Sequence, residues 1–203
     1  MIKNIIFDVG FVLVDFRWRE LMEDLDIPKD VQEKFADKVF GSPWWNELDR
    51  GVIDEDEIVS KLREENSPHY DEFDLVWANR DKIVKPYDYA VGMIETLRAR
   101  GFKVYLLSNY PESLFELHTK CGYFPFVDKV DGKVVSGVVK MVKPDQEIYE
   151  YLLKTYDLKA EECVFLDDRE ENVEAAKKVG INGILFEGYE QAWAELNEKV
   201  QNP

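Results

Sequence analysis

Three aspartates stand at the ends of two apolar runs, and their types and spacing point to chemistry. Asp8 follows the run at residues 5–7, and Asp167 and Asp168 follow the run at residues 164–166. If the two runs are neighbouring parallel strands, the three acids meet at the carboxyl edge of one sheet, where α/β proteins bind their ligands. Crowded carboxylates repel one another and raise each other's pKa, so a divalent hard cation is their natural counter-charge. The pattern therefore predicts a Mg²⁺ site.

Two further polar landmarks stand between these acids in chain order. Ser108 and Asn109 follow the apolar residues 104–107, and Lys143 precedes Pro144 at a helix start. A carboxylate such as Asp8 can attack phosphorus. The hydroxyl of Ser108 and the backbone N–H groups after it suit phosphoryl oxygens, and Lys143 supplies positive charge. Each residue alone has a simpler interpretation as a turn cap, a helix N-cap or a surface lysine, but their ordered conjunction predicts a phosphoryl-transfer centre.

Short apolar runs bounded by turn residues alternate with amphipathic stretches, which indicates a parallel sheet wrapped by helices. Residues 18–84 differ, because they show helical periodicity broken at Pro28 and at residues 41–43, without a strand run. This segment is predicted to be a helical insertion. Residues 127–141 are predicted to form a β-ribbon or an irregular excursion. The predicted strands are residues 2–7, 103–107, 163–166 and 183–186, and the predicted helices of the main domain are residues 87–100, 144–156 and 170–179.

Composition narrows the class of protein. Acids outnumber bases 42 to 26 among 203 residues, the formal net charge is -16, and no Lys/Arg cluster offsets it, which argues against nucleic-acid and anionic-membrane partners. No run approaches the roughly 20 apolar residues that span a bilayer, and the amino terminus lacks a signal-peptide pattern. Two cysteines, Cys121 and Cys163, are most simply explained by a reducing compartment. We therefore expect a cytoplasmic protein; the sequence carries no signal of oligomeric state.

The landmarks resemble the motifs of the haloacid dehalogenase-like superfamily, most closely its phosphatases with a small helical cap. The resemblance covers essentially the whole chain, including the helical insertion between the first two motifs. Motifs spaced in this order are far more specific than any one of them. They are FDVGFVLVD at residues 7–15, LSN at 107–109, KPDQEIY at 143–149 and FLDDREEN at 165–172.

What the resemblance implies for the fold is an α/β protein with a doubly wound parallel sheet. The Rossmann-like core would comprise residues 1–15 and 85–203, and an inserted, small all-helical cap domain would comprise residues 16–84. For function, the resemblance implies magnesium-dependent hydrolysis of a small phosphorylated metabolite through an aspartyl-phosphate, with Asp8 as nucleophile and Lys143 beside it.

By the family pattern, Mg²⁺ would be held by Asp8, by the backbone carbonyl of Gly10 and by Asp168, with Asp167 close by. One departure matters. Most phosphatases of this superfamily carry an aspartate as general acid two residues after the nucleophile, where this chain has Gly10. A proton donor contributes roughly 10²–10⁴ in rate. Asp15 is a candidate substitute, although a polar residue where the chain leaves for the insertion is the simpler interpretation.

The helical insertion would determine substrate specificity. Glycine at position 10 resembles family members that act on sugar phosphates such as glucose 1-phosphate, whose anomeric leaving group depends less on protonation. Trp44 and Trp45 lie among polar side chains in residues 41–51, a combination suited to a sugar ring and its hydroxyls. Adjacent helical positions face different directions, so at most one indole can easily enter the site. Alternatively, Trp44, Trp45 and Trp77 fill the core of the insertion.

Two competing functions remain open. A hydrolytic 2-haloacid dehalogenase would use the same aspartate on carbon without a metal, but Asp167 and Asp168 would then be unneutralised. A non-catalytic protein that binds a phosphorylated ligand would explain the lost acid at Gly10, although Asp8, Lys143 and the acid pair are all retained. Chelation of metal separates the first alternative from a phosphatase.

Overall fold

The computed structural model describes residues 1–201, and within this range a five-stranded sheet forms the centre of the main domain. All its neighbouring strands are parallel, in the order β5-β4-β1-β6-β7. The chain therefore moves outward from β1 to one edge and then to the other edge. This is the predicted doubly wound α/β core, with its switch point at β1. The strands are β1 (Asn4–Phe7), β4 (Lys103–Ser108), β5 (Gly132–Val135), β6 (Cys163–Asp167) and β7 (Asn182–Leu185).

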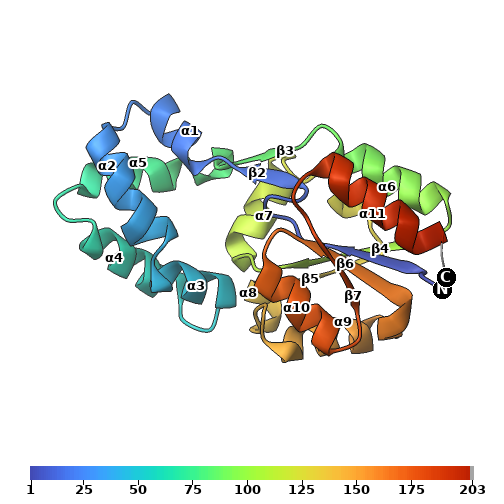
Figure 1. Cartoon of the computed structure of the whole chain (residues 1–203). Coiled ribbons are helices and arrows are strands. Elements are labelled where there is room, and N and C mark those ends of the chain that lie inside the picture. Colours follow the sequence, from blue (N-terminus) through green and yellow to red (C-terminus); the bar gives the residue numbers. More distant parts are fainter. Residues whose placement is uncertain (202–203) are drawn as a thin grey trace.

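Helices cover both faces of this sheet (Figure 1). Successive strand residues point to opposite faces, so Ile5 and Phe7 belong to one apolar cluster and Ile6 to the other. Burial on both faces explains why the strands are continuous apolar runs in the sequence. The first cluster is completed by α6 (Ala90–Ala99), α7 (Glu112–Lys120) and α11 (Tyr189–Gln201), and the second by α9 (Gln146–Thr155) and α10 (Glu170–Lys178).

The helical insertion leaves and rejoins the core through a short antiparallel ribbon of β2 (Val14–Phe16) and β3 (Val84–Pro86). It lies beside the carboxyl edge of the sheet, at the end of the molecule opposite the amino terminus (Figure 1). Val31, Phe35 and Val39, spaced at one helix face, are buried as their periodicity predicts. Its helices are α1 (Trp18–Asp24), α2 (Lys29–Phe35), the π-helix η1 (Ala36–Phe40), α3 (Pro43–Arg50), α4 (Glu55–Glu65), α5 (Tyr70–Ala78) and the 3₁₀ turn η2 (Arg80–Lys82).

The prediction of a ribbon or an irregular excursion at residues 127–141 is wrong. This stretch holds the 3₁₀ turn η3 (Val127–Lys129), the strand β5 and the short helix α8 (Ser136–Val139). β5 is an edge strand that pairs only with β4, and its first two residues are not buried, so its apolar run is short.

The helix predicted at residues 144–156 begins two residues later, because Asp145 occupies the N-cap position of α9 and Pro144 precedes it. The 3₁₀ turn η4 (Ala160–Glu162) leads into β6. Within residues 1–201, every helix falls short of the length and hydrophobicity needed to cross a bilayer.

Candidate active site

The carboxyl edge of the sheet brings two of the predicted acids together. Asp8 directly follows β1, and Asp167 is the last residue of β6. These strands are parallel neighbours with Phe7 opposite Leu166, and the backbone N–H of Asp8 donates to the carbonyl of Leu166 at 2.9 Å. The two carboxylates therefore lie side by side at the switch point of the sheet.

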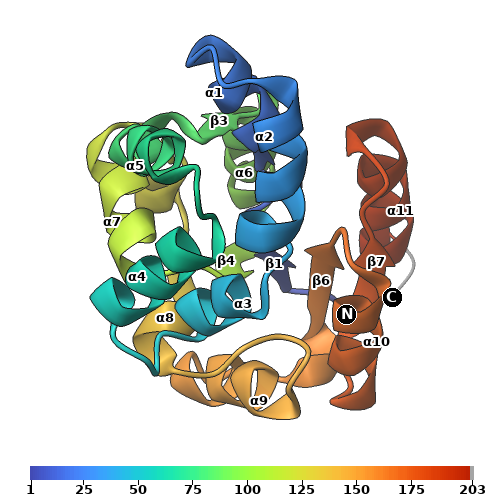
Figure 2. The ribbon, with the colours of Figure 1, turned by 90° about the vertical axis from the view of Figure 1, so that its left-hand side faces the viewer.

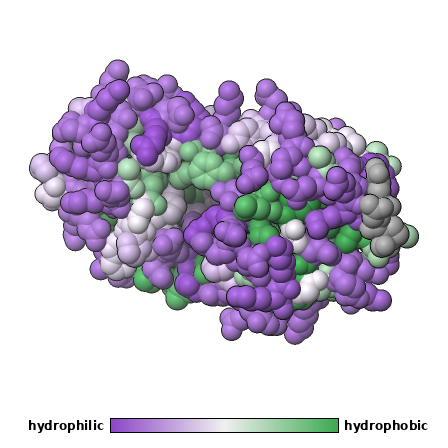
Figure 3. Space-filling view, in the orientation of Figure 1, coloured by the Kyte–Doolittle hydropathy of each residue, from purple (hydrophilic) through white to green (hydrophobic). Residues whose placement is uncertain are grey.

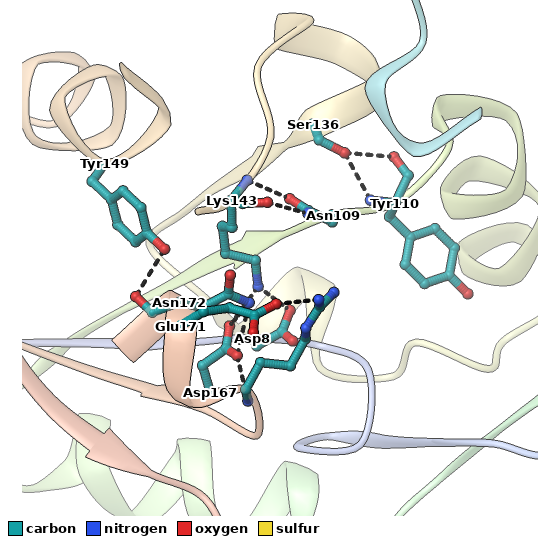
Figure 4. Close-up of polar contacts among 10 residues, drawn as sticks. Asp8, Asn109, Tyr110, Ser136, Lys143, Tyr149, Asp167, Glu171 and Asn172 are labelled. Carbon is teal, nitrogen blue, oxygen red and sulfur yellow. Dashed lines mark hydrogen bonds and ion pairs between the residues drawn. The ribbon is translucent and has the colours of Figure 1, made fainter. Parts of the chain in front are cut away.

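The ammonium of Lys143 lies between these carboxylates (Figure 4). Its Nζ is 2.8 Å from Oδ1 of Asp8 and 2.7 Å from Oδ2 of Asp167. The side chains of Lys143 and Asp167 are 1% and 0% exposed, so bulk water cannot hydrate these charges. We call Asp8, Lys143 and Asp167 the charge cluster. Buried charges of this kind are tolerated only when they are paired and hydrogen-bonded.

Asp167 is fixed inside the charge cluster by further donors. The backbone N–H of Arg169 donates to its Oδ1 at 2.9 Å, and Nδ2 of Asn172 lies 2.9 and 3.1 Å from its two oxygens. Asn172 belongs to the first turn of α10, and its carbonyl accepts from the hydroxyl of Tyr149 on α9 at 2.9 Å. The side chain of Asp167 is thus used to hold Lys143 in place.

Asn109 fixes the same lysine through its backbone. Its Nδ2 donates to the carbonyl of Lys143 at 2.9 Å, and the backbone N–H of Lys143 donates to its Oδ1 at 2.8 Å. The amide side chain of Asn109 therefore joins the loop after β4 to the loop that carries the lysine. Ser108, one residue earlier, is 1% exposed, and its Oγ has no hydrogen-bond partner among the described residues. A buried hydroxyl without a partner is a group that a ligand can satisfy.

The charges of the site are out of balance in favour of the acids. Burial raises the pKa of Asp8 well above its usual range; Lys143 opposes this, while the charges of Asp167 and Asp168 add to it. Burial disfavours the charge on Lys143, but Asp8 and Asp167 outweigh that effect and raise its pKa. Burial and then Asp167 raise the pKa of Asp168. One ammonium therefore faces three carboxylates.

These carboxylates fit a hard divalent cation. Asp8, Asp167 and Asp168 each offer an oxygen, and the three oxygens lie within 4.8 Å of one another. Among the described residues, no lysine or arginine lies within ion-pair distance of Asp168. Gly10 lines the same cavity, and a Cβ built on it would meet nothing within 4 Å. Oxygen donors beside open space are the surroundings that Mg²⁺ requires.

A cavity of about 260 Å³ opens above the charge cluster, between the core and the insertion. Figure 3 shows hydrophobic surface where the insertion meets the core, between hydrophilic outer faces. Polar side chains line part of the cavity, among them Asp8, Lys143 and Asp168 from the core and Asn46 and Asp49 from the insertion. Much of the rest of the wall is apolar and consists of aromatic and aliphatic side chains, namely Phe11, Val14, Phe16, Phe40, Trp45, Ile83, Val84 and Leu114.

The two predicted tryptophans separate. Trp45 lines the cavity and packs against Phe16 and Phe40, at ring-centroid distances of 5.9 and 5.0 Å. Trp44 does not line it: its side chain is half-buried, and its indole N–H donates to the exposed Glu65 at 2.9 Å. Neighbouring positions on a helix face different directions, so the structure does not bring Trp44 to the site.

Comparison with known proteins agrees with this geometry. Residues 2–180 match the family model for haloacid dehalogenase-like hydrolases. The chain belongs to this family. It is 30% identical over 202 residues to the sesquiterpene phosphatase astK of Aspergillus oryzae, covering 98% of this chain and 96% of the relative.

Two further similarities come from Bacteroides thetaiotaomicron. Its D-ribitol-5-phosphate phosphatase is 26% identical over 191 residues, covering 89% of each chain. Its family enzyme bt-2542, solved with magnesium and inorganic phosphate, superposes with a TM-score of 0.70 at 24% identity, covering 94% of this chain and 98% of that one. The superposition shows a shared fold, and the phosphatase relatives accord with the resemblance stated from the motifs.

Several cavity residues of this haloacid dehalogenase-like hydrolase were not singled out from the sequence. Arg169 and Asn172 line the cavity, and both stand in the fourth motif, shortly after Asp167 and Asp168. Asn46 and Asp49 line it from α3. Their spacing of three residues, which places both on one helix face, was a usable signal.

Removal of the lysine should expose the imbalance of charge. In metal-free protein at pH 8, Lys143→Met should lower the free energy of unfolding by roughly 3–5 kcal/mol, because two buried carboxylates lose their counter-ion. As the pH falls to 5, Asp8 takes up a proton in the folded state and the deficit should shrink. Urea unfolding at both pH values measures this. Lys120→Met, which removes an exposed lysine beside Glu116, is the control; a deficit at pH 8 no larger than that of the control would contradict the prediction.

Proposed function

We propose that this hydrolase is a magnesium-dependent phosphatase that cleaves a small phosphomonoester through an aspartyl-phosphate on Asp8. The charge cluster carries this proposal. Lys143 engages one oxygen of Asp8 at 2.8 Å and is itself held by Asp167. Asp8 is thereby oriented at the floor of a cavity that has room for an ester. An oriented carboxylate beside a fixed cation is the arrangement that covalent phosphoryl transfer needs.

The residues divide the reaction between them. Asp8 attacks phosphorus, and the ester oxygen departs; water then attacks the same phosphorus, releases inorganic phosphate and regenerates Asp8. The ammonium of Lys143 offsets negative charge on the transferred group. Asn109 holds the lysine in place through hydrogen bonds to its backbone. The unpartnered hydroxyl of Ser108 is available to donate to a phosphoryl oxygen.

Magnesium enters the proposal through charge. A dianionic phosphate beside Asp8, Asp167 and Asp168 would face only one buried ammonium, and such repulsion is strong inside a protein. Asp8, the backbone of Gly10 and Asp168 would hold the ion, which supplies positive charge to the phosphoryl oxygens. The crystal structure of bt-2542, a family enzyme of the same fold in complex with magnesium and inorganic phosphate, supports this assignment.

The two alternatives from the sequence are less well supported. A metal-independent dehalogenase leaves the carboxylates of Asp8, Asp167 and Asp168 within 4.8 Å of one another with one lysine. A non-catalytic binder of phosphorylated ligands gains nothing from a carboxylate aimed at phosphorus, since it repels the ligand. The names of the phosphatase relatives also favour turnover.

Metal dependence tests the proposal directly. EDTA should abolish release of inorganic phosphate from p-nitrophenyl phosphate, and added Mg²⁺ should restore it. Asp8→Asn should show no turnover with the metal present, because an amide cannot form the acyl phosphate. Asp128→Asn removes an exposed carboxylate on η3 and should retain full activity. Activity that survives EDTA, or an Asp8→Asn variant as fast as Asp128→Asn, would contradict the proposal.

The lining of the cavity bears on the organic part of the substrate. The sequence favours a sugar phosphate, and Trp45 offers a face on which a sugar ring can stack. One observation favours a second candidate, an ester with an apolar organic group. Most of the wall beyond the charge cluster is aromatic or aliphatic, including Phe16, Phe40 and Leu114. Sugar hydroxyls facing such a wall would lose hydrogen bonds to water, so we propose the apolar ester as the better fit.

A substrate panel separates the two classes. With Mg²⁺, kcat/KM for an isoprenyl monophosphate should exceed that for a sugar 1-phosphate or a sugar 6-phosphate. Trp45→Ala should raise KM for the isoprenyl ester with little change in kcat, since it removes contact that is the same in ground and transition states. Trp44→Ala, on the adjacent position outside the cavity, is the matched control.

Two results would overturn the assignment of an apolar substrate. A sugar 1-phosphate that turns over faster than every apolar ester, and much faster than the 6-phosphate, would support the sugar-phosphate candidate instead. Equal effects of Trp44→Ala and Trp45→Ala on KM would show that the apolar wall of the cavity does not bind the organic group.

A further inference from the structure

Gly10 leaves the proposed reaction without a proton donor at the position where most related phosphatases have one. The departing ester oxygen of an alkyl phosphate needs a proton, and the attacking water must lose one. A Cβ on Gly10 would meet nothing within 4 Å, so the space beside Asp8 is open to a group from elsewhere in the fold. The cavity is lined by few carboxylic acids. Within residues 1–201 they are Asp8, Asp49 and Asp168, and the first and last are already assigned to attack and metal binding.

Asp49 reaches the cavity from the insertion. It stands in the last turn of α3 and lines the same cavity as Asp8 and Lys143. Its side chain is partly exposed there. No residue in the described part of the chain donates a hydrogen bond to its carboxylate or forms an ion pair with it. Asp49 thus lines the cavity with a carboxyl group that has no hydrogen-bond or ion-pair partner among the described residues.

The backbone of Asp49 is anchored to the core. Its carbonyl accepts from Oγ of Ser136 at 2.5 Å, and the same Oγ accepts from the backbone N–H of Tyr110 at 2.8 Å. Ser136 is fully buried on α8, which lies beside α3 in Figures 1 and 2. Figure 4 shows the Ser136 and Tyr110 contacts close to the charge cluster.

The end of α3 is held at two further points. Gly51 ends the helix with φ +67, and a Cβ there would lie 2.8 Å from the carbonyl of Gly137 on α8. Arg50 bridges to Asp145, at the start of α9, at 3.5 Å. These contacts hold the last turn of α3 against the core, so the position of Asp49 over the site is set by the fold.

The surroundings of Asp49 allow its carboxyl group to hold a proton near neutral pH. Enclosure between the insertion and the sheet edge raises its pKa to about 7; Lys143 opposes this shift, the negative charge of Asp8 adds to it and Arg169 opposes it. On its own helix the charged neighbours are Glu47 and Arg50, which pair with each other at 3.9 Å. A carboxyl group with this balance can give up and take back a proton within one turnover.

We propose that Asp49, supplied by the insertion, is the general acid and base of the phosphatase reaction in place of the residue missing at Gly10. This inference rests on the proposed phosphatase function. The alternatives within the fold are excluded by position. Asp15 lies on β2, opposite Lys85 in the ribbon, and does not line the cavity. Tyr110 lines the cavity, but its hydroxyl is already hydrogen-bonded to Nδ1 of His118 at 2.8 Å.

The proton moves as follows. When Asp8 forms its bond to phosphorus, the bond from phosphorus to the ester oxygen breaks, and its electron pair stays on that oxygen. Asp49 gives its proton to this oxygen, and the alcohol leaves. The Asp49 carboxylate then takes a proton from water as the water oxygen attacks phosphorus, and the bond from phosphorus to Asp8 breaks. Inorganic phosphate departs, Asp8 is again a carboxylate, and Asp49 is again protonated.

Leaving groups of different basicity test this role. In Asp49→Asn, hydrolysis of an alkyl phosphate, whose alkoxide needs the proton, should fall by roughly 10²–10⁴ in kcat/KM. The value of kcat/KM for p-nitrophenyl phosphate, which reports transfer of the phosphoryl group to Asp8, should fall far less, because its phenolate leaves unprotonated. Glu47→Gln removes a carboxylate from the same helix outside the cavity and should change neither rate. Asp49→Ser provides a second variant, and circular dichroism establishes that each variant is folded.

Each outcome has a distinct meaning. A selective loss on the alkyl ester supports the inference. An equal loss of kcat/KM on both esters in a folded variant, or no loss of kcat/KM on the alkyl ester, overturns it while leaving the phosphatase function intact. If wild-type protein with Mg²⁺ hydrolyses neither ester, or if Asp8→Asn retains activity, the proposed function itself is wrong, and the role of Asp49 is rejected with it.

Discussion

The position of one buried ammonium between two carboxylates organises this molecule. Lys143 can remain charged at 1% exposure only because Asp8 and Asp167 lie 2.8 and 2.7 Å from it. Those acids meet because β1 and β6 are adjacent and parallel, and the lysine reaches them because Asn109 ties its backbone to the loop after β4. The proposed nucleophile Asp8, its counter-ion Lys143 and the acid Asp167 are thus brought together from segments that are distant in sequence. The same cluster leaves a surplus of negative charge, which is why a divalent cation belongs to the proposed chemistry.

The core and the insertion contribute different things. The core supplies the groups proposed to act on phosphorus, and hydrogen bonds hold them in place, as the donors around Asp167 show. The insertion supplies the apolar wall with Trp45 and the free carboxyl group of Asp49. Substrate choice and proton transfer would then both depend on how α3 is seated on α8. Under the proposed function, this division would let a chain with glycine at position 10 retain activity, since the proton donor need not come from the strand end that carries the proposed nucleophile.

Much of this could be predicted from the sequence, for a physical reason. Strands buried on both faces leave continuous apolar runs, and the acids that end such runs must share one sheet edge; β1, β4 and β6 and the meeting of Asp8 with Asp167 and Asp168 follow from that alone. The edge strand β5 was missed because a half-exposed strand leaves only a short run. Which of Trp44 and Trp45 lines the cavity, and the presence of Asp49 in the same cavity as Asp8, depend on how the insertion docks. Docking is determined by contacts such as that of Ser136 with the carbonyl of Asp49, which join residues 87 positions apart.

The most direct test is to look for the covalent intermediate at the charge cluster. Wild-type protein with Mg²⁺ and an excess of substrate is quenched in acid within the first turnover, digested and analysed by mass spectrometry. The phosphoryl group is expected on the peptide that contains Asp8, attached to that side chain, and it should be absent when the quench follows complete consumption of the substrate. Turnover without any phosphorylated Asp8, or a phosphoryl group attached to another residue, would contradict the assignment of Asp8 as the nucleophile held by Lys143.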